Sequence, residues 1–202
     1  PTTKPNYDLE FYRTRATQLD IRIFEMRALL QSGKGFSNLL NSKDLLETFM
    51  SVVREKYGVR NSTVFLRDDL DPNRDYYQVR AFHGVPDTFI DSKGREEALQ
   101  MFKFERNTGL LWQLIQQGDI FSVRDLNHDP RLKTAWREWN LEVLQSDVWC
   151  PLLRGSDVLG VITLGETWDG RQIPESDYPF LQELASIAAT NIDAVLKYEK
   201  NS

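Results

Sequence analysis

The stretch VWCPLLRGSDVLGVITL, at residues 148–164, decides the fold class of this chain. Its two apolar runs, 148–153 and 158–164, each have the length and composition of a buried β-strand. The short polar segment from Arg154 to Asp157 joins them and includes a glycine. Such a connection is typical of a tight hairpin. The sequence therefore predicts two neighbouring antiparallel strands.

Similar signals extend from this hairpin in both directions. A second hairpin is predicted from 62–66 and 76–82, with a turn between them that contains Pro72. Helices with apolar stripes are predicted at 42–57, where Ser42 is a candidate N-cap, and at 175–198. The middle of the chain predicts a strand at 99–104, a helix at 110–117, a strand at 120–123 and a helix at 132–145.

This order of elements indicates the layers of the fold. Adjacent hairpins produce an antiparallel sheet, and helices near both ends of the chain can pack together on one of its faces. The expected class is α+β, with an α/β three-layer arrangement around a central antiparallel sheet. We expect residues 1–35 to form an N-terminal amphipathic or coiled-coil helix, and residues 36–198 to form the domain that ends in the helix 175–198.

Composition excludes several function classes. The net charge of −5 argues against nucleic acid and anionic membrane as partners, because both require a basic surface. The chain has neither a long apolar run nor a signal peptide, and its one cysteine, Cys150, cannot form an internal disulfide. We therefore expect a cytoplasmic protein. Because the sequence starts at Pro1 and ends beside a helical pattern, we also expect it to be part of a longer protein.

Both terminal helices carry apolar residues at alternating spacings of three and four. The N-terminal seam runs for about three heptads. Its predicted dimer-interface residues are Leu19, Ile23, Met26 and Leu30, and those of the C-terminal seam are Leu184, Asn191 and Val195. A polar residue at a seam position can fix the register of a coiled coil. These seams predict a homodimer, and the alternative is that each helix packs against its own domain.

Several motifs follow one another along the chain. The longest is GLLWQLIQQGDIFSVRDL at 109–126, in which a short helix lies between two glycines and a strand leads to Asp125. The others are DPR at 129–131, CPL at 150–152, GSDVLGVITL at 155–164 and IPESD at 173–177. In this order, the motifs resemble the GAF family. The resemblance covers roughly residues 36–198, and it rests on the order and spacing of the motifs rather than on any one of them.

The resemblance implies a GAF-like central antiparallel sheet of five or six strands, with the N- and C-terminal helices on one face. The segment 85–146 would fold over the other face and enclose a ligand pocket. Gly160 would lie where two strands cross closely. The resemblance also implies a regulatory sensor domain of a signalling protein rather than an enzyme.

Residues that carry chemistry are sparse in this sequence. The two histidines, His83 and His128, have no partner at metal-ligand spacing, and no phosphate-binding glycine loop is present. Cys150 lies inside a predicted strand, which favours a structural role, although bilin-binding relatives attach their chromophore through a cysteine. The sequence therefore predicts no catalytic residue, no metal and no resident cofactor.

Aromatic residues concentrate in the segment expected to enclose the pocket. Four of the five tryptophans lie between positions 112 and 149. Aromatic rings suit flat ligands, and charged neighbours can supply polar contacts. The predicted ligand-binding residues are Phe82, Trp112, Phe121, Arg124, Asp125, Trp136, Trp139 and Trp149. The alternative is that these rings only fill the core.

We therefore predict a regulatory domain that binds a small molecule, such as a nucleotide or another flat heteroaromatic. The domain would transmit the signal through dimeric terminal helices to an effector outside this sequence. A cyclic nucleotide is one candidate, although the Asn-Lys-Phe-Asp-Glu signature of cyclic-nucleotide-binding relatives is matched only at Asp177. The alternative function is a structural homodimerisation module with no ligand.

Overall fold

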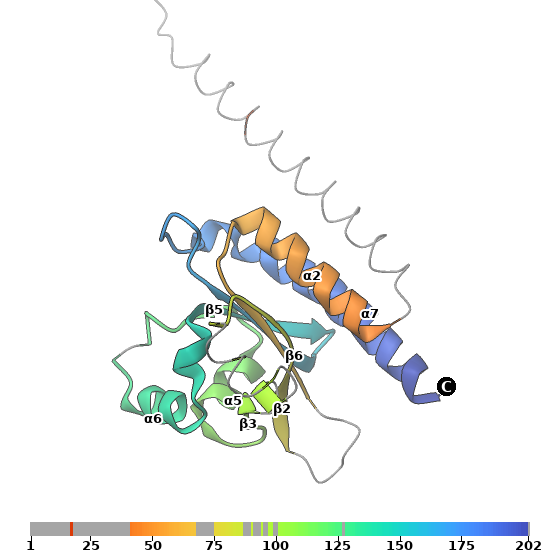
Figure 1. Ribbon diagram of the computed structural model, residues 1–202, viewed down its shortest axis with the longest axis horizontal. Helices are drawn as coiled ribbons and strands as arrows, with labels where there is room; N and C mark the ends of the chain where they lie inside the picture. The colour runs from red at the N-terminus through yellow and green to blue at the C-terminus, as the bar shows by residue number, and fades with distance from the viewer. Residues whose placement is uncertain are drawn as a thin grey trace, which may run out of the picture.

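The computed structural model describes residues 41–67, 75–86, 90, 94, 97–98, 101–126 and 128–201, together with residue 17 (Figure 1). Apart from residue 17, the predicted helix at 1–35 lies outside these ranges, and so do its interface residues Leu19, Ile23, Met26 and Leu30. Among the described residues, no helix combines the length and the apolar character needed to cross a membrane.

Six antiparallel strands form one sheet, in the order β3-β2-β1-β6-β5-β4. The strands are β1 (Ser62–Arg67), β2 (Tyr76–His83), β3 (Lys103–Glu105), β4 (Phe121–Ser122), β5 (Ser146–Arg154) and β6 (Asp157–Gly165). The two predicted hairpins form the centre of the sheet, because β1 pairs with both β2 and β6. The prediction of an α+β fold around a central antiparallel sheet is confirmed.

Two long helices, α2 (Ser42–Tyr57) and α7 (Tyr178–Asn201), lie side by side on one face of the sheet (Figure 1). The short 3-10 helix η2 (Glu175–Asp177) leads into α7. The Asn41 side chain, rather than Ser42, caps α2 by accepting a hydrogen bond from the Asp44 backbone N–H at 2.7 Å. Aliphatic side chains of these helices and of alternate strand residues form the first core.

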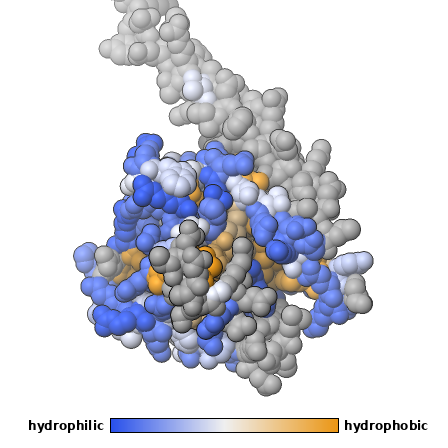
Figure 2. All heavy atoms as spheres, in the orientation of Figure 1, coloured by the Kyte–Doolittle hydropathy of each residue, from blue (hydrophilic) through white to orange (hydrophobic). Residues whose placement is uncertain are grey.

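A second layer of helices covers the opposite face of the sheet. Among the described residues it includes α5 (Gly109–Gln117), α6 (Pro130–Glu138) and the 3-10 helix η1 (Leu141–Leu144). A second core lies here and is rich in aromatic rings, among them Phe65, Phe104 and Trp149. In the view of Figure 2 the surface is mostly hydrophilic, with hydrophobic side chains visible in the hollows. The sheet is therefore the middle of three layers.

Two predicted elements of the middle segment differ from the structure. The strand predicted at 99–104 is confirmed at Lys103 and Phe104 and wrong at Met101, which is helical; residues 99 and 100 lie outside the described ranges. A short apolar run does not distinguish a strand from a buried helix. The helix predicted at 132–145 begins at 130 and ends at Glu138, and Asn140 then adopts the left-handed backbone conformation with φ 55°. Asparagine tolerates this conformation better than most residues.

The interface predicted on the C-terminal helix is corrected at Leu184 and Val195. Leu184 is fully buried and Val195 is 9% exposed, and both belong to the core between α7, α2 and the sheet. Asn191 is half-buried, and its side chain donates to the Ile187 carbonyl one turn earlier at 2.8 Å. The apolar face of α7 therefore packs against the sheet and α2 of its own chain, as the apolar stripe of a surface helix commonly does.

Cys150 lies in β5 on the face covered by α7. Its side chain is fully buried, with Sγ 4.0 Å from the Leu181 carbonyl oxygen, and this burial raises the pKa of the thiol far above its ordinary value. The thiolate is the reactive form, so the thiol should stay protonated and inert between about pH 7 and 9.

We expect the Cys150 thiol of the native domain to react with an aromatic disulfide reagent about 100-fold more slowly than that of the urea-unfolded chain. The reaction can be monitored by the absorbance of the released aromatic thiol. Fast labelling of Cys150 in the native domain would contradict this burial.

Candidate functional site

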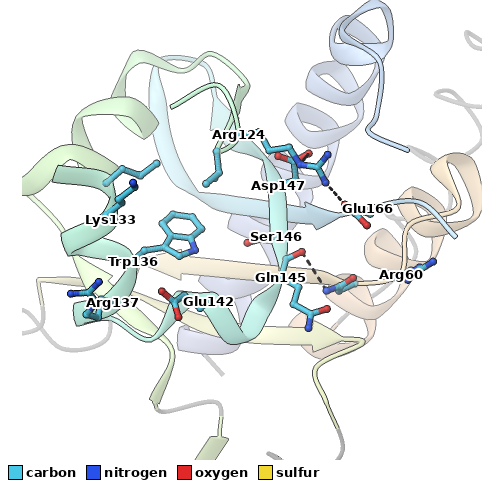
Figure 3. A pocket seen from close by; sticks show the side chains of 13 residues that line it. Arg60, Arg124, Lys133, Trp136, Arg137, Glu142, Gln145, Ser146, Asp147 and Glu166 are labelled. Carbon is cyan, nitrogen blue, oxygen red and sulfur yellow. Dashed lines mark hydrogen bonds and ion pairs between the residues drawn. The ribbon is translucent and has the colours of Figure 1, made fainter. Parts of the chain in front are cut away.

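A cavity of about 580 Å³ opens at the end of the sheet where β1 begins, β6 ends and β5 begins (Figure 3). One wall is formed by α6 and η1, and the opposite wall by the turn after β4 and the end of β6. Side chains of both charges line the cavity, with one indole among them. Its volume falls within the range of small-molecule sites. We call it the end cavity.

Helix α6 supplies the aromatic and cationic wall of the end cavity. The helix begins after its N-cap Asp129, with a proline in the first turn, which suits both positions. Leu132 and Trp136 are one turn apart and face the second core, where Leu132 is buried and Trp136 is half-buried. Lys133 and Arg137 form the neighbouring row of the helix and lie at the cavity, as Figure 3 shows.

Arg124 dominates the opposite wall. It lies in the turn after β4, forms an ion pair with Glu166, and places its Nε 3.6 Å from an Asp147 carboxylate oxygen (Figure 3). Asp147 is buried and also accepts hydrogen bonds from Ser122 Oγ at 3.0 Å and from Gln172 Nε2 at 2.9 Å. These two carboxylates hold the Arg124 guanidinium across this side of the cavity.

Asn61, at the floor of the end cavity, connects the end of η1 with the end of β6 through hydrogen bonds. It is buried, its side-chain Nδ2 donates to the Leu144 carbonyl at 2.9 Å, and its backbone carbonyl accepts from the Gly165 N–H at 2.9 Å. Gly165 has no room for a side chain, since a Cβ there would lie 2.5 Å from Asn61 Oδ1. Gln145, which follows η1, has a left-handed backbone with φ 47°. That conformation costs a non-glycine residue about 1 kcal/mol, which the contacts of Asn61 help to offset.

Ser146 leaves an unused polar atom in the lining of the end cavity. Its Oγ is buried and has no hydrogen-bond partner among the residues that the structure describes. Buried hydroxyl groups in native proteins are usually paired. This hydroxyl therefore has unused hydrogen-bonding capacity beside the cavity.

The end cavity brings together two of the predicted ligand-binding residues, Arg124 and Trp136. Phe82 and Trp149 are instead buried in the second core, and Phe121 is half-buried against it. The structure thus places these three rings in or against the core, which was the alternative to ligand binding. The position of a ring in the chain does not reveal whether it reaches a cavity.

The other predicted ligand-binding residues also lie outside the end cavity. Trp112 packs against the second core, Trp139 lines a smaller cavity between α5 and α6, and Asp125 is exposed. Lys133 and Arg137, the cationic pair of α6, are not among the ligand-binding residues predicted from the sequence. The signal for this pair was present, because Lys133, Trp136 and Arg137 fall on one helix at spacings that bring them to neighbouring positions.

Metal-binding residues do not converge at this site. Within the described ranges of the chain, no group of three or more His, Cys, Asp and Glu side chains is placed to hold a metal ion. His83 lies at the end of β2, where partial burial and the nearby Arg54 lower the pKa of its imidazole. It is not part of the end cavity.

Solved structures with this fold include GAF domains. One from a phosphoenolpyruvate-protein phosphotransferase of Coxiella burnetii matches with a TM-score of 0.63 at 15% identity, covering 87% of this chain and 96% of that one. The GAF domain of the Acinetobacter phosphoenolpyruvate-protein phosphotransferase has a TM-score of 0.62 at 14% identity, covering 88% and 98%. The free methionine-R-sulfoxide reductase of Neisseria meningitidis, solved with its substrate, has a TM-score of 0.59 at 19% identity, covering 86% and 91%. At these identities the likeness concerns the fold alone.

A search of curated proteins finds no significant match to this chain. The family model described as GAF domain matches residues 40–193, which include every strand of the sheet and both walls of the end cavity. GAF domains are sensory and regulatory domains, and some of them bind ligands or chromophores. The motifs, the fold and the family match agree, and the chain belongs to the GAF domain family.

Proposed function

We propose that this domain is a sensor that binds a flat, anionic small molecule, such as a nucleotide, in the end cavity. The observation that carries the proposal is the position of Trp136 beside Lys133 and Arg137 on one cavity wall (Figure 3). A ring stacked on the indole would place an attached phosphate or carboxylate next to two cationic side chains. The cavity volume of about 580 Å³ suits a ligand of this size.

The cationic side chains that line the end cavity fall into two groups: those already bound to other protein groups and those available to a ligand. Arg124 is engaged by two carboxylates, and Arg60 donates to the Trp168 carbonyl at 2.9 Å. Lys133 and Arg137 have no ion-pair partner among the described residues. An anionic group on the ligand is therefore the partner that this wall lacks. Because both side chains are exposed, each contact should contribute only about 1 kcal/mol.

Helix α7 offers a route from the end cavity to another domain. It packs along β5, and the first residues of β5, Ser146 and Asp147, line the cavity. Side chains of α7 also bind the β5 backbone, since Gln182 Nε2 donates to the Pro151 carbonyl at 3.2 Å and Ser186 Oγ to the Leu153 carbonyl at 3.2 Å. A ligand that repositions the start of β5 would bias the pose of α7, and a domain joined to α7 would respond.

A regulatory role accounts for the residues of this chain better than catalysis does. The relative from Neisseria is a reductase of free methionine-R-sulfoxide. A cysteine that takes part in reduction reacts as its thiolate and must be accessible. Cys150 is the only cysteine of this chain, and it is buried in the core on the opposite face of the sheet from the second core and α6.

Calorimetric titration with adenosine monophosphate, guanosine monophosphate and their cyclic forms tests the proposal. We expect at least one of them to bind the wild-type domain, and the corresponding nucleoside, which lacks the phosphate, to bind more weakly. Arg137→Gln should weaken binding by about 5-fold, because one charge contact is lost. Trp136→Leu should weaken it by about 10-fold, because the stacking surface is removed.

Arg131→Gln is the matched control for Arg137→Gln. Arg131 is on the same helix, but its guanidinium is bound to Asp129 and lies outside the end cavity. An equal loss of affinity in the two variants would show that the helix attracts anions without a defined site. Binding that is unaffected by Trp136→Leu, or no binding of any of the four nucleotides, would contradict the proposed function.

A further inference from the structure

A row of five side chains crosses the sheet on the face of the second core. The row consists of residues that are register partners on adjacent strands: Phe82, Thr63, Thr163, Trp149 and Phe121. Its first, fourth and fifth members contact the aromatic core on this face, and strand alternation places the two threonines on the same side. Thr63 is 1% exposed and Thr163 is 0% exposed, so both hydroxyl groups lie beneath the surface.

Two polar atoms in the middle of this row have no partner. Trp149 Nε1 and Thr163 Oγ1 are buried, and neither forms a hydrogen bond within the part of the chain that the structure describes. Burying such groups unpaired is unfavourable, and native proteins pair the large majority of them. Because Trp149 and Thr163 are register partners, the two unpaired groups belong to side chains that are next to each other on adjacent strands.

The row lies directly inward of the end cavity. Asn61, which lines the cavity, is two residues from Thr63, and Gly165, to which Asn61 is hydrogen-bonded, is two residues from Thr163. Two residues of an extended strand span about 7 Å. The floor of the cavity and the row with the unpaired atoms are therefore neighbouring rows on one face of the sheet.

Trp136 connects the cavity with this inner row. Its side chain lines the cavity, and the centroid of its ring lies 5.2 Å from that of Trp149. The Trp149 ring itself is held between Phe65 and Phe121, with centroid distances of 5.8 and 5.9 Å and small interplanar angles. These two phenylalanines come from strands on opposite sides of β5. Packing thus covers the faces of Trp149 and leaves its N–H edge as a fixed donor.

We propose that Trp149 Nε1 and Thr163 Oγ1 form an inner subsite of the end cavity, reached by the ring edge of a ligand that stacks on the Trp136 indole. In this subsite they hydrogen-bond to the ring edge of the bound ligand, while its anionic group stays at Lys133 and Arg137. This inference rests on the proposed function and specifies the ligand further. An indole N–H only donates, so the ring atom that faces it is an acceptor, such as a carbonyl oxygen or an unprotonated ring nitrogen. The neighbouring ring atom meets a hydroxyl, which both donates and accepts.

Thr163→Val tests the subsite, because it removes the hydroxyl and keeps the shape of the side chain. We expect the affinity for the tightest-binding of the four nucleotides to fall by about 10-fold. The urea midpoint of the unliganded domain should stay unchanged or rise, because no hydrogen bond is lost in that state. Thr163→Ser, which keeps the hydroxyl, should restore most of the affinity.

Ser62→Ala is the matched control. Ser62 Oγ is also buried and without a partner among the described residues, but Ser62 alternates with Thr63 and therefore points to the opposite face, under α2 and α7. This variant should show the same neutral or stabilising effect on unfolding and no loss of affinity. Equal losses of affinity in Thr163→Val and Ser62→Ala would overturn the subsite.

The indole N–H resonance of Trp149 gives a second readout that a purely structural role would not move. It can be assigned by its absence from the spectrum of Trp149→Phe, and it should shift downfield on addition of the same nucleotide as it gains an acceptor. If Trp136→Leu weakens binding but Thr163→Val does not, and this resonance stays in place, the inner subsite is wrong and the proposed function stands. If neither substitution weakens binding, both are wrong.

Discussion

Trp149→Ala should destabilise the domain by about 3–5 kcal/mol, the usual result of deleting a large aromatic ring from a packed core. Trp149 is 0% exposed, and the rings of Phe65, Phe104, Phe121 and Trp136 have centroids within 5.9 Å of its own. Domains are typically stable by only about 5–15 kcal/mol. The variant should therefore lose a large part of its stability, measured as the free energy of unfolding in urea by circular dichroism.

Trp168→Ala provides the control for this substitution. Trp168 is 67% exposed, so its removal should change the free energy of unfolding by about 0.5 kcal/mol or less. The comparison separates the effect of losing a tryptophan from the effect of losing a core residue. Similar losses in the two variants would contradict the position of Trp149 at the centre of the second core.

Gly160→Ala should destabilise the domain by about 3 kcal/mol, the upper part of the range for overpacking a core. A Cβ at Gly160 would lie 2.0 Å from the Phe65 backbone oxygen and 2.8 Å from Leu66 Cδ2. The backbone oxygen belongs to β1, which pairs with β6 at this point, so it cannot move without disturbing the centre of the sheet. Urea unfolding measures the loss.

Gly155→Ala separates this steric effect from backbone strain. Gly155 has φ +62° in the β5–β6 turn, and no atom lies within 4 Å of the position that a Cβ would take. Its substitution should cost about 1 kcal/mol through the left-handed conformation alone. A Gly160→Ala variant that is as stable as Gly155→Ala would show that the two central strands can separate to admit a methyl group.

The sequence predicted the central strands of the sheet and the helix α2 better than it predicted the chain segment 85–146. The runs around Gly155 and the apolar stripe of 42–57 are local signals, and the structure confirms the hairpin and the helix that they predicted. The strand predicted at 99–104 is confirmed only at Lys103 and Phe104, and Met101 is helical, because a short apolar run suits a helix and a strand equally well. The seam of Leu184 and Val195 was visible, but its partner, the same domain's sheet and α2, was not.

The candidate site was predicted only at Trp136 and Arg124. Other residues that form it, such as Asn61, Asp147 and Glu166, are far apart in the sequence. They meet because antiparallel pairing brings the start of β1, the start of β5 and the end of β6 to the same end of the sheet. Register of this kind is set by pairing and packing across the sheet. No local pattern reveals it.

The amino-acid sequence by itself determined the class of the protein, because hairpin turns, helix stripes and the order of the GAF motifs are written in short stretches. Only the tertiary structure decided which rings line a cavity and which fill a core. Trp136 and Trp149 look alike in the sequence, yet one reaches the end cavity and the other is enclosed by Phe65 and Phe121. The reason is physical: burial depends on the elements that pack over a side chain, and these come from distant parts of the chain.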